Sequence, residues 1–410
     1  MGVTRRTLWW IRPVWTQHHQ SAILYMYNIR SLTQLQSSTY PAQPDLAVLL
    51  TSHWAVSNPS NIEPWVVLLN FGRDILQAPP RAGKCHSLAK LIKCRIDGKD
   101  EHKHGNETEL PSRSRKPQKL SKRSPEELLA ATVSSKVEDG NIRAAARILF
   151  SDERPAEIND YTYAQLCAKH PSSSDLEKIF TASDVNVECL QVSEAEVMRA
   201  VMSFPAGSAA GPDGVRPQHL IQLIKCPASG AQLLIALASL VNCLLRGACP
   251  SSITPVLFGA KLIALNKKSG GIRPIAIGYT WRRLASKCAN TYASFLTADY
   301  LQPLQVGVGV PGGCEAAVHA TRRFLETMQD GKVIAKLDFS NAFNTIKRSH
   351  VLQAVHSRAP AIYKFCMLSY GRPSQLRYSS YTVMPREGVQ QGDPLGPLLF
   401  SLTIHPCLHH

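Results

Sequence analysis

Acidic residues are scarce in this chain of 410 residues, which has 30 Asp and Glu against 46 Lys and Arg. The shortage leaves a formal net charge of +16. An excess of this size favours a polyanionic partner, with nucleic acid as the first expectation and an anionic membrane surface as the second. The competing interpretation is that the charge serves solubility alone, but solubility seldom requires so large an excess of basic residues.

Two further absences narrow the class of protein. None of the 11 cysteines forms a C-x-x-C pair, and no apolar run is long enough to span a membrane as a helix. We therefore expect free thiols in a reducing compartment, with no disulfide-linked partner and no membrane-spanning segment, and we prefer nucleic acid to a membrane as the partner. Cys85, His86, Cys94, His102 and His104 only loosely imitate a zinc site, because their spacing fits no standard template.

Residues 1–60 are also poor in acidic side chains, and Asp45 is the first of them. Their composition imitates a mitochondrial presequence, but Pro13 would break the helix that such a presequence forms. We therefore treat residues 1–60 as an unassigned extension and expect no mitochondrial presequence in residues 1–44. The predicted location is intracellular, in the nucleus or the cytoplasm.

Residues 61–123 are interpreted as a basic region and linker. Its last part is strongly polar and holds too few apolar side chains to fold alone. Six basic residues gather there in one cluster, at Arg113, Arg115, Lys116, Lys119, Lys122 and Arg123. We expect this basic cluster to act as a nucleic-acid tether or a nuclear-import signal. A solvated linker with neither role is an equal alternative.

From residue 124 onward, the sequence predicts mainly helices. Ser124, Pro125 and the two following glutamates open a small helical region over residues 124–185. Ser193 and Glu196 form a capping box before the next helix. Further helices are predicted over residues 217–224, 231–245, 281–301, 315–328, 347–358 and 360–368. The glycines of the loop at residues 206–214 allow close backbone approach, but the loop lacks the P-loop pattern.

A β-hairpin is predicted over residues 261–277, where two apolar runs flank a turn of suitable composition. Lys267, Lys268 and Arg273 would project from this hairpin. They are either ordinary turn cations or a clamp for phosphates, and an arginine can engage two phosphate oxygens at once. A second, short hairpin is predicted over residues 375–384.

Residues 333–337 form a short apolar run that ends on a carboxylate, Asp338. This pattern predicts a strand that projects Asp338 from a buried sheet edge. A carboxylate held there suits a hard cation such as Mg²⁺, which prefers oxygen ligands. Capping of the helix that follows is the alternative role for Asp338.

Four segments occur in one order along the chain. They are Gly-Pro-Asp-Gly at 211–214, Gly-Gly-Ile-Arg-Pro-Ile at 270–275, Lys-Leu-Asp-Phe-Ser-Asn-Ala-Phe at 336–343 and Gly-Val-Gln-Gln-Gly-Asp-Pro-Leu-Gly-Pro at 388–397. Together they closely resemble the reverse transcriptase of non-LTR (LINE-like) retrotransposons. The resemblance implies an α+β fold, with the fingers and an incomplete palm of a right-hand polymerase in residues 190–410. It also implies RNA-directed DNA synthesis with an RNA template, a DNA primer and Mg²⁺.

The resemblance assigns Asp338 the role of the metal-binding Asp of the palm strand, and the backbone carbonyl of Phe339 that of a neighbouring ligand. The chemistry explains these residue types. Nucleotidyl transfer uses two cations, one at the primer 3′-hydroxyl and one at the leaving pyrophosphate. Bridging both cations takes two or three carboxylates, because positioning and charge neutralisation supply most of the catalysis.

The resemblance also assigns nucleotide-binding roles. Phe343 matches the bulky residue that lies under the sugar and disfavours a 2′-hydroxyl. Gln391 and Gly392 match the pair that packs beside the templating base and the incoming nucleotide. Arg273 and Lys267 match residues of the fingers that grip the triphosphate.

The sequence departs from the family pattern at its end. The family's aromatic-x-Asp-Asp hairpin, which carries two more carboxylates, is absent before His410, and Asp393 is interpreted as a helix cap. We therefore expect a truncated, inactive polymerase, poorly soluble because apolar surface near residues 398–402 is left bare. The alternatives are a non-catalytic nucleic-acid-binding protein that uses the fingers and the basic cluster, and an incomplete version of an active enzyme.

Overall fold

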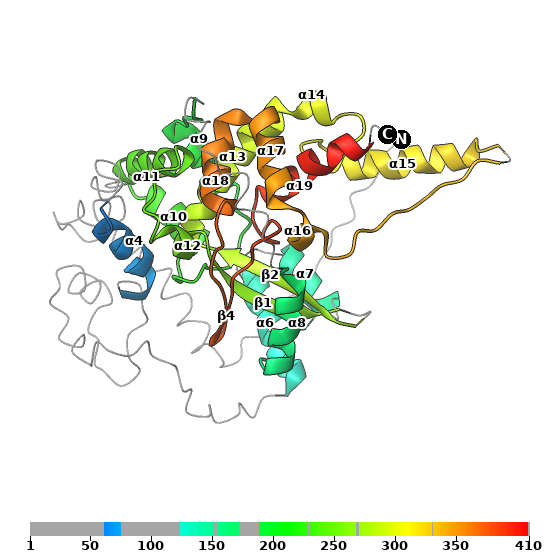
Figure 1. Cartoon of the computed structure of the whole chain (residues 1–410). Helices are drawn as coiled ribbons and strands as arrows, with labels where there is room; N and C mark the ends of the chain where they lie inside the picture. Colours follow the sequence, from blue (N-terminus) through cyan, green and yellow to red (C-terminus); the bar gives the residue numbers. More distant parts are fainter. Residues whose placement is uncertain are drawn as a thin grey trace, which may run out of the picture.

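The computed structural model describes residues 61–74, 124–138, 140, 142–150, 154–171, 188–227, 230–267, 270–329 and 331–408. Helices combine with one four-stranded mixed sheet, which confirms the α+β class. The extension at residues 1–60, the group from Cys85 to His104 and the basic cluster at 113–123 lie outside the described residues. Figure 1 shows most helices gathered on one side of the sheet and α6–α8 on the other.

Most helices lie where the sequence predicts them. Those before the sheet are α4 (Glu63–Asp74), α6 (Pro125–Glu138), α7 (Ile142–Phe150), α8 (Asp160–Lys169), α9 (Glu194–Met202), α10 (Pro217–Ile224), α11 (Gly230–Leu245) and α12 (Thr254–Leu257). Those after its first hairpin are α13 (Thr280–Leu296), α14 (Ala298–Leu301), α15 (Gly313–Glu326), α16 (Ala342–Thr345), α17 (Arg348–Arg358), η3 (Pro360–Ile362), α18 (Tyr363–Tyr370), α19 (Gly396–Ile404) and η4 (His405–Leu408).

The predicted caps explain where two of these helices begin. Before α6, the Glu127 amide donates to Ser124 Oγ at 3.2 Å and the Ser124 amide donates to Glu127 Oε2 at 2.9 Å. Before α9, Ser193 and Glu196 make the same reciprocal pair. Each box satisfies backbone N–H groups that a helix start leaves without an intrahelical partner.

The main core lies among α9–α11, α13 and α17–α19. Leu237 and Leu244 of α11 and Trp281 of α13 are almost completely buried in it. Complete burial of such an apolar side chain stabilises the fold by about 1.5–3 kcal/mol. Trp65 of α4 is buried in the same core, although α4 precedes the rest by more than a hundred residues. The division of the chain into four regions stays a prediction.

The sheet has the strand order β2-β1-β3-β4. The predicted hairpin is confirmed as β1 (Ala260–Asn266) and β2 (Ile272–Gly278), and the second one as β3 (Leu376–Tyr378) and β4 (Tyr381–Val383). A parallel pairing of β1 with β3 joins the two hairpins. Leu166 of α8 is buried against this sheet, so α8 covers part of one of its faces.

The predicted strand over residues 333–337 is wrong. Residues 332–339 follow α15 as an irregular stretch, with Val333 85% and Leu337 81% exposed. An apolar run becomes a strand only where a neighbouring strand pairs with its backbone groups, and the sheet of the described residues offers it no such neighbour. Figure 1 shows α15 reaching away from the body and the chain returning along this stretch.

The expected apolar surface at residues 398–402 is also wrong. Leu398, Leu399 and Leu402 are buried, because α19 packs against α17. Exposed apolar side chains lie instead on several other parts of the described residues, among them α15 and residues 333–339. Within the described ranges, no helix is both long enough and apolar enough to span a bilayer.

Candidate functional site

A four-residue turn, Gln390-Gln391-Gly392-Asp393, stands at the centre of the candidate site. The Asp393 amide donates to the Gln390 carbonyl at 3.1 Å, so Gln391 and Gly392 occupy the two corner positions. Gly392 has φ +132°, and a Cβ there would lie 2.3 Å from the Ala276 carbonyl oxygen. Only glycine allows this conformation and this close approach.

The turn is seated on β2. The Ala276 amide donates to the Gln391 carbonyl at 2.8 Å, which attaches the turn to the strand that also carries Arg273. Arg273 is half-buried opposite Leu265 of β1, and Lys267 is exposed in the loop that joins the two strands. The hairpin therefore connects the predicted triphosphate-binding residues to the predicted template-binding turn.

Phe343 of α16 lies on the other side of the same segment. Its carbonyl accepts from the Val389 amide at 2.7 Å, and the Ile346 carbonyl accepts from the Gly388 amide at 2.9 Å. The Phe343 ring is stacked on Phe400 of α19, with centroids 5.2 Å apart and planes 12° apart. Phe343, Gln391 and Gly392 thus come together around β2, although they lie more than sixty residues beyond it in the sequence.

Arg348 holds the beginning of this segment. Its guanidinium is buried and donates through Nε to the Gly388 carbonyl at 2.9 Å, while its backbone amide donates to Glu387 Oε2 at 2.8 Å. Burial lowers the pKa of Arg348 to about 10, although Tyr370 and Glu387 favour the charged form. The guanidinium therefore stays charged near neutral pH.

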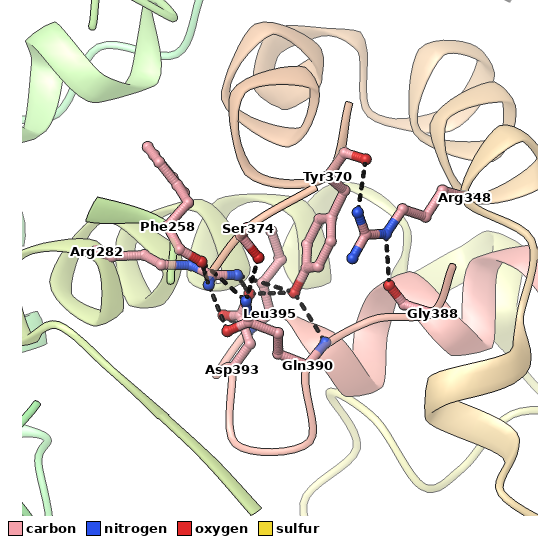
Figure 2. A network of polar contacts seen from close by, with 9 residues as sticks. All are labelled: Phe258, Arg282, Arg348, Tyr370, Ser374, Gly388, Gln390, Asp393 and Leu395. Atoms are coloured by element: carbon pink, nitrogen blue, oxygen red, sulfur yellow. Dashed lines mark hydrogen bonds and ion pairs between the residues drawn. The ribbon is translucent and has the colours of Figure 1, made fainter. Parts of the chain in front are cut away.

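Arg282 of α13 holds the end of the segment (Figure 2). It is 1% exposed and forms an ion pair with Asp393 at 2.8 Å. Its guanidinium also donates to the Gln390 side chain and to the Tyr370 hydroxyl. Burial raises the pKa of Tyr370 well above its ordinary value, and the neighbouring Asp393 raises it further, so the hydroxyl keeps the proton that it donates to Asp393.

The predicted helix cap at Asp393 is wrong in its position, because α19 begins at Gly396 with Leu395 as its N-cap and Asp393 lies in the turn before it. One carboxylate oxygen accepts from the Leu395 amide at 3.1 Å, and the other accepts from Arg282 and Tyr370. Both oxygens are therefore engaged inside the protein. This arrangement explains why Asp393 is unsuited to a metal ion, despite its position in the matched segment.

Asp338 lies in the irregular stretch that follows α15. It is exposed and precedes Phe339, whose ring meets Phe400 edge-on with centroids 6.5 Å apart. The described part of the chain contains no group of three or more His, Cys, Asp or Glu that could hold a metal ion. One carboxylate and one carbonyl do not fit a two-cation site.

A small pocket lies behind the turn, between β2 and α16, and its lining includes Pro274, Asn344, Gln390 and Gln391. Its volume of about 10 Å³ is room for about one water molecule. A nucleotide does not fit there. The face available to a larger ligand is the outer one, where Gly392 is exposed.

The Gly-Pro-Asp-Gly loop packs against α4 and the start of α13. A Cβ on Gly211 would lie 2.7 Å from the Tyr279 Cα, which confirms the close backbone approach expected of this loop. Asp213 is buried, and one of its oxygens accepts from the Val215 amide at 3.1 Å. Burial raises the pKa of Asp213 to about 7, despite the opposing effects of its hydrogen bonds and of Arg283.

Sequence reasoning missed Arg282, Tyr370 and Phe400. Arg282 lies in the predicted helix over residues 281–301, yet its side chain is buried. One signal was available, because Glu387 and Asp393 are the only acidic residues after Asp338. A carboxylate buried in so basic a region needs a charged partner. The identity of that partner cannot be derived from the sequence alone.

Comparison with known proteins gives two matches. Residues 265–410 match the protein family described as reverse transcriptase (RNA-dependent DNA polymerase). The 132 kDa protein of the retrotransposable element SLACS from Trypanosoma brucei gambiense is 27% identical over 264 residues. That alignment covers 62% of this chain and 22% of the SLACS protein, so the chain spans about a fifth of this relative's length.

Proposed function

We propose that the chain, whose residues 265–410 match the reverse transcriptase family, binds an RNA template and a DNA primer for RNA-directed DNA synthesis. In this proposal the β1–β2 hairpin and α13 belong to the fingers, and residues 333–404 belong to the palm. The LINE-like lineage is part of the same proposal. The observation that carries it is the docking of the Gln391–Gly392 turn on β2 beside Phe343.

Each residue has a defined role in this proposal. The exposed face of Gly392 lies beside the templating base, because a residue without a side chain leaves room for a base pair. Phe343, braced by Phe400, lies under the sugar of the incoming nucleotide. Lys267 and Arg273 contact its phosphates, where an arginine fork gives two parallel hydrogen bonds.

The metal part of the proposal is limited to Asp338 and the Phe339 carbonyl. Bound Mg²⁺ would supply charge neutralisation at the reacting phosphate. A single carboxylate does not complete that site, so we propose that these 410 residues alone do not extend a primer. A primer-extension assay with Mg²⁺ or Mn²⁺ tests this. Sustained template-dependent synthesis that Asp338→Ala abolishes would show that the active site is complete.

A second candidate is a nucleic-acid-binding protein without catalysis, using the fingers and the basic cluster at residues 113–123. The net charge of +16 favours it. The two candidates differ in what a bound nucleotide does. Template-directed chemistry requires that a complementary nucleotide binds better than a mismatched one, whereas simple phosphate binding is indifferent to the base.

A further inference from the structure

One guanidinium contacts both ends of the Gln390–Asp393 turn. Arg282 Nη1 donates to Gln390 Oε1 and to the Phe258 carbonyl, the latter at 2.6 Å. Arg282 Nη2 donates to Asp393 Oδ2 at 2.8 Å and to the Tyr370 hydroxyl at 3.1 Å. Figure 2 shows these groups converging from α13, α18 and the turn itself.

The Gln390 side chain makes further hydrogen bonds that hold the first end of the turn. Its Nε2 donates to the Phe258 carbonyl at 2.8 Å and to Ser374 Oγ at 3.1 Å. Its backbone amide donates to the Tyr370 hydroxyl at 3.4 Å. The first residue of the turn is therefore tied to the entry of β1 and to the segment before β3.

The corner residues are held far less tightly than the ends. Gln391 is half-buried and attached through its backbone carbonyl to Ala276, and Gly392 is exposed without a side chain. The position of the corner over β2 therefore depends on this one hydrogen bond, on the close contact of Gly392 with Ala276, and on where the two ends of the turn are held. Both ends are held by Arg282.

We propose that Arg282 is a positioning residue, which places the Gln391–Gly392 corner at the height over β2 where it can test the fit of an incoming nucleotide against the template. This inference rests on the proposed function. Arg282 touches neither substrate in this account and acts only through Gln390 and Asp393. The geometry requires a fork, because four acceptors in different directions must be reached from one side chain.

Replacing Arg282 with lysine distinguishes a positioning role of this side chain from a role in packing alone. Arg282→Lys keeps a charge for Asp393, but a single ammonium cannot also reach Gln390, Phe258 and Tyr370. Asp393→Asn removes the charge at the other end of the turn. Lys287→Arg is the matched control, since Lys287 lies on the same helix and donates to Ser203 rather than to the turn.

The test uses the full 410-residue chain and a labelled RNA template–DNA primer duplex whose primer lacks a 3′-hydroxyl. Fluorescence anisotropy gives the Kd of the duplex alone and with a complementary or a mismatched deoxynucleoside triphosphate. The wild type and Lys287→Arg should bind the duplex more tightly with the complementary nucleotide. Arg282→Lys and Asp393→Asn should lose that preference by about tenfold, while the Kd for the duplex alone changes less than about twofold. An undiminished preference in Arg282→Lys would overturn the inference.

A second measurement decides the inference even if the wild type shows no nucleotide preference, which would count against the proposed function instead. Hydrogen exchange of the free protein should be at least about tenfold faster in Arg282→Lys for residues 386–396 and unchanged for α11. Unchanged exchange in the turn would overturn the positioning role. So would faster exchange throughout the chain, because that result describes a purely structural arginine.

Discussion

At the scale of single residues, Gly392 and Gly388 allow the turn segment to pack closely against β2 and α16. Gly388 has φ +79°, and a Cβ there would lie 2.4 Å from the Asn344 Cα. Gly392 meets β2 equally closely. These glycines could be noticed in the sequence, but their partners could not, because each is more than forty residues away along the chain.

Gly392→Ala should lower the free energy of unfolding by on the order of 2–3 kcal/mol, since the new Cβ would lie 2.3 Å from the Ala276 oxygen and φ would remain unfavourable. Urea denaturation measures this. Gly270→Ala is the control, because Gly270 has φ +83° but no atom within 4 Å of the added Cβ. It should cost only about 1 kcal/mol. Equal losses for the two variants would contradict the close contact at Gly392.

Asp213 should make stability depend on pH. Its folded pKa of about 7 lies above the ordinary 3.8, so between these values the folded state binds more protons than the unfolded state. Stability contributed by the protonated form is therefore lost as pH rises from about 4 to about 7. His219 has the opposite effect on the free energy of unfolding. Burial lowers its pKa to about 4, so the stability contributed by its neutral form increases as pH rises from about 4 to about 6.5.

The difference between wild type and Asp213→Asn isolates the contribution of Asp213. Denaturation at pH 4, 5, 6, 7 and 8 should show the variant gaining stability relative to wild type as pH rises, with the gain levelling above pH 7. Asp299→Asn is the control, because Asp299 is exposed. A difference between wild type and Asp213→Asn that stays constant with pH would contradict the raised pKa.

At the scale of elements, the sequence correctly predicted the helices whose positions are determined by residues close together in the chain. Capping boxes and apolar spacing correctly located α6, α9 and α10, because the groups that decide those helices lie within a few residues. The run at 333–337 failed for the opposite reason. Its strand propensity depends on a distant partner, and the described residues place none beside it.

Helix α15 lies where the sequence predicts a helix, but its apolar side chains are exposed. Its apolar side chains recur at a spacing of three and four residues, yet Val318, Phe324 and Leu325 are 49%, 43% and 53% exposed. Such a stripe usually faces a core. Because it is exposed on the surface, we expect this stripe to promote self-association.

Leu325→Ser should therefore reduce self-association without lowering the free energy of unfolding, since Leu325 is 53% exposed. Sedimentation velocity and urea denaturation measure the two quantities. Leu237→Ser on α11 is the contrasting variant, because Leu237 is fully buried. It should cost about 3 kcal/mol or more. A large loss of stability in Leu325→Ser would mean that α15 is covered in solution.

At the scale of the whole molecule, the composition predicts a nucleic-acid partner, which stays a prediction, and the motifs predicted the family that residues 265–410 match. The arrangement could not be predicted, because the parallel pairing of β1 with β3 joins segments more than a hundred residues apart. The burial of Trp65 in the main core is equally non-local. These contacts are what place β2, α16 and the turn together.

The net charge should make nucleic-acid binding steeply dependent on salt. If about five phosphates are neutralised, log K should fall against log salt with a slope of about −4. Lys267→Gln should reduce that slope by about 1, because its exposed ammonium lies on the hairpin loop. Lys225→Gln, an exposed lysine after α10, is the control. A slope unchanged by Lys267→Gln would remove the hairpin from the binding surface.

The central claim is that the Gln391–Gly392 turn and β2 form the surface that meets the templating base. Photo-cross-linking tests it most directly, with a 4-thiouridine at the first unpaired template position and the attachment site mapped by mass spectrometry. We predict attachment within residues 386–396 or in β2. Attachment confined to the basic cluster at residues 113–123 would contradict the claim and favour binding without template reading.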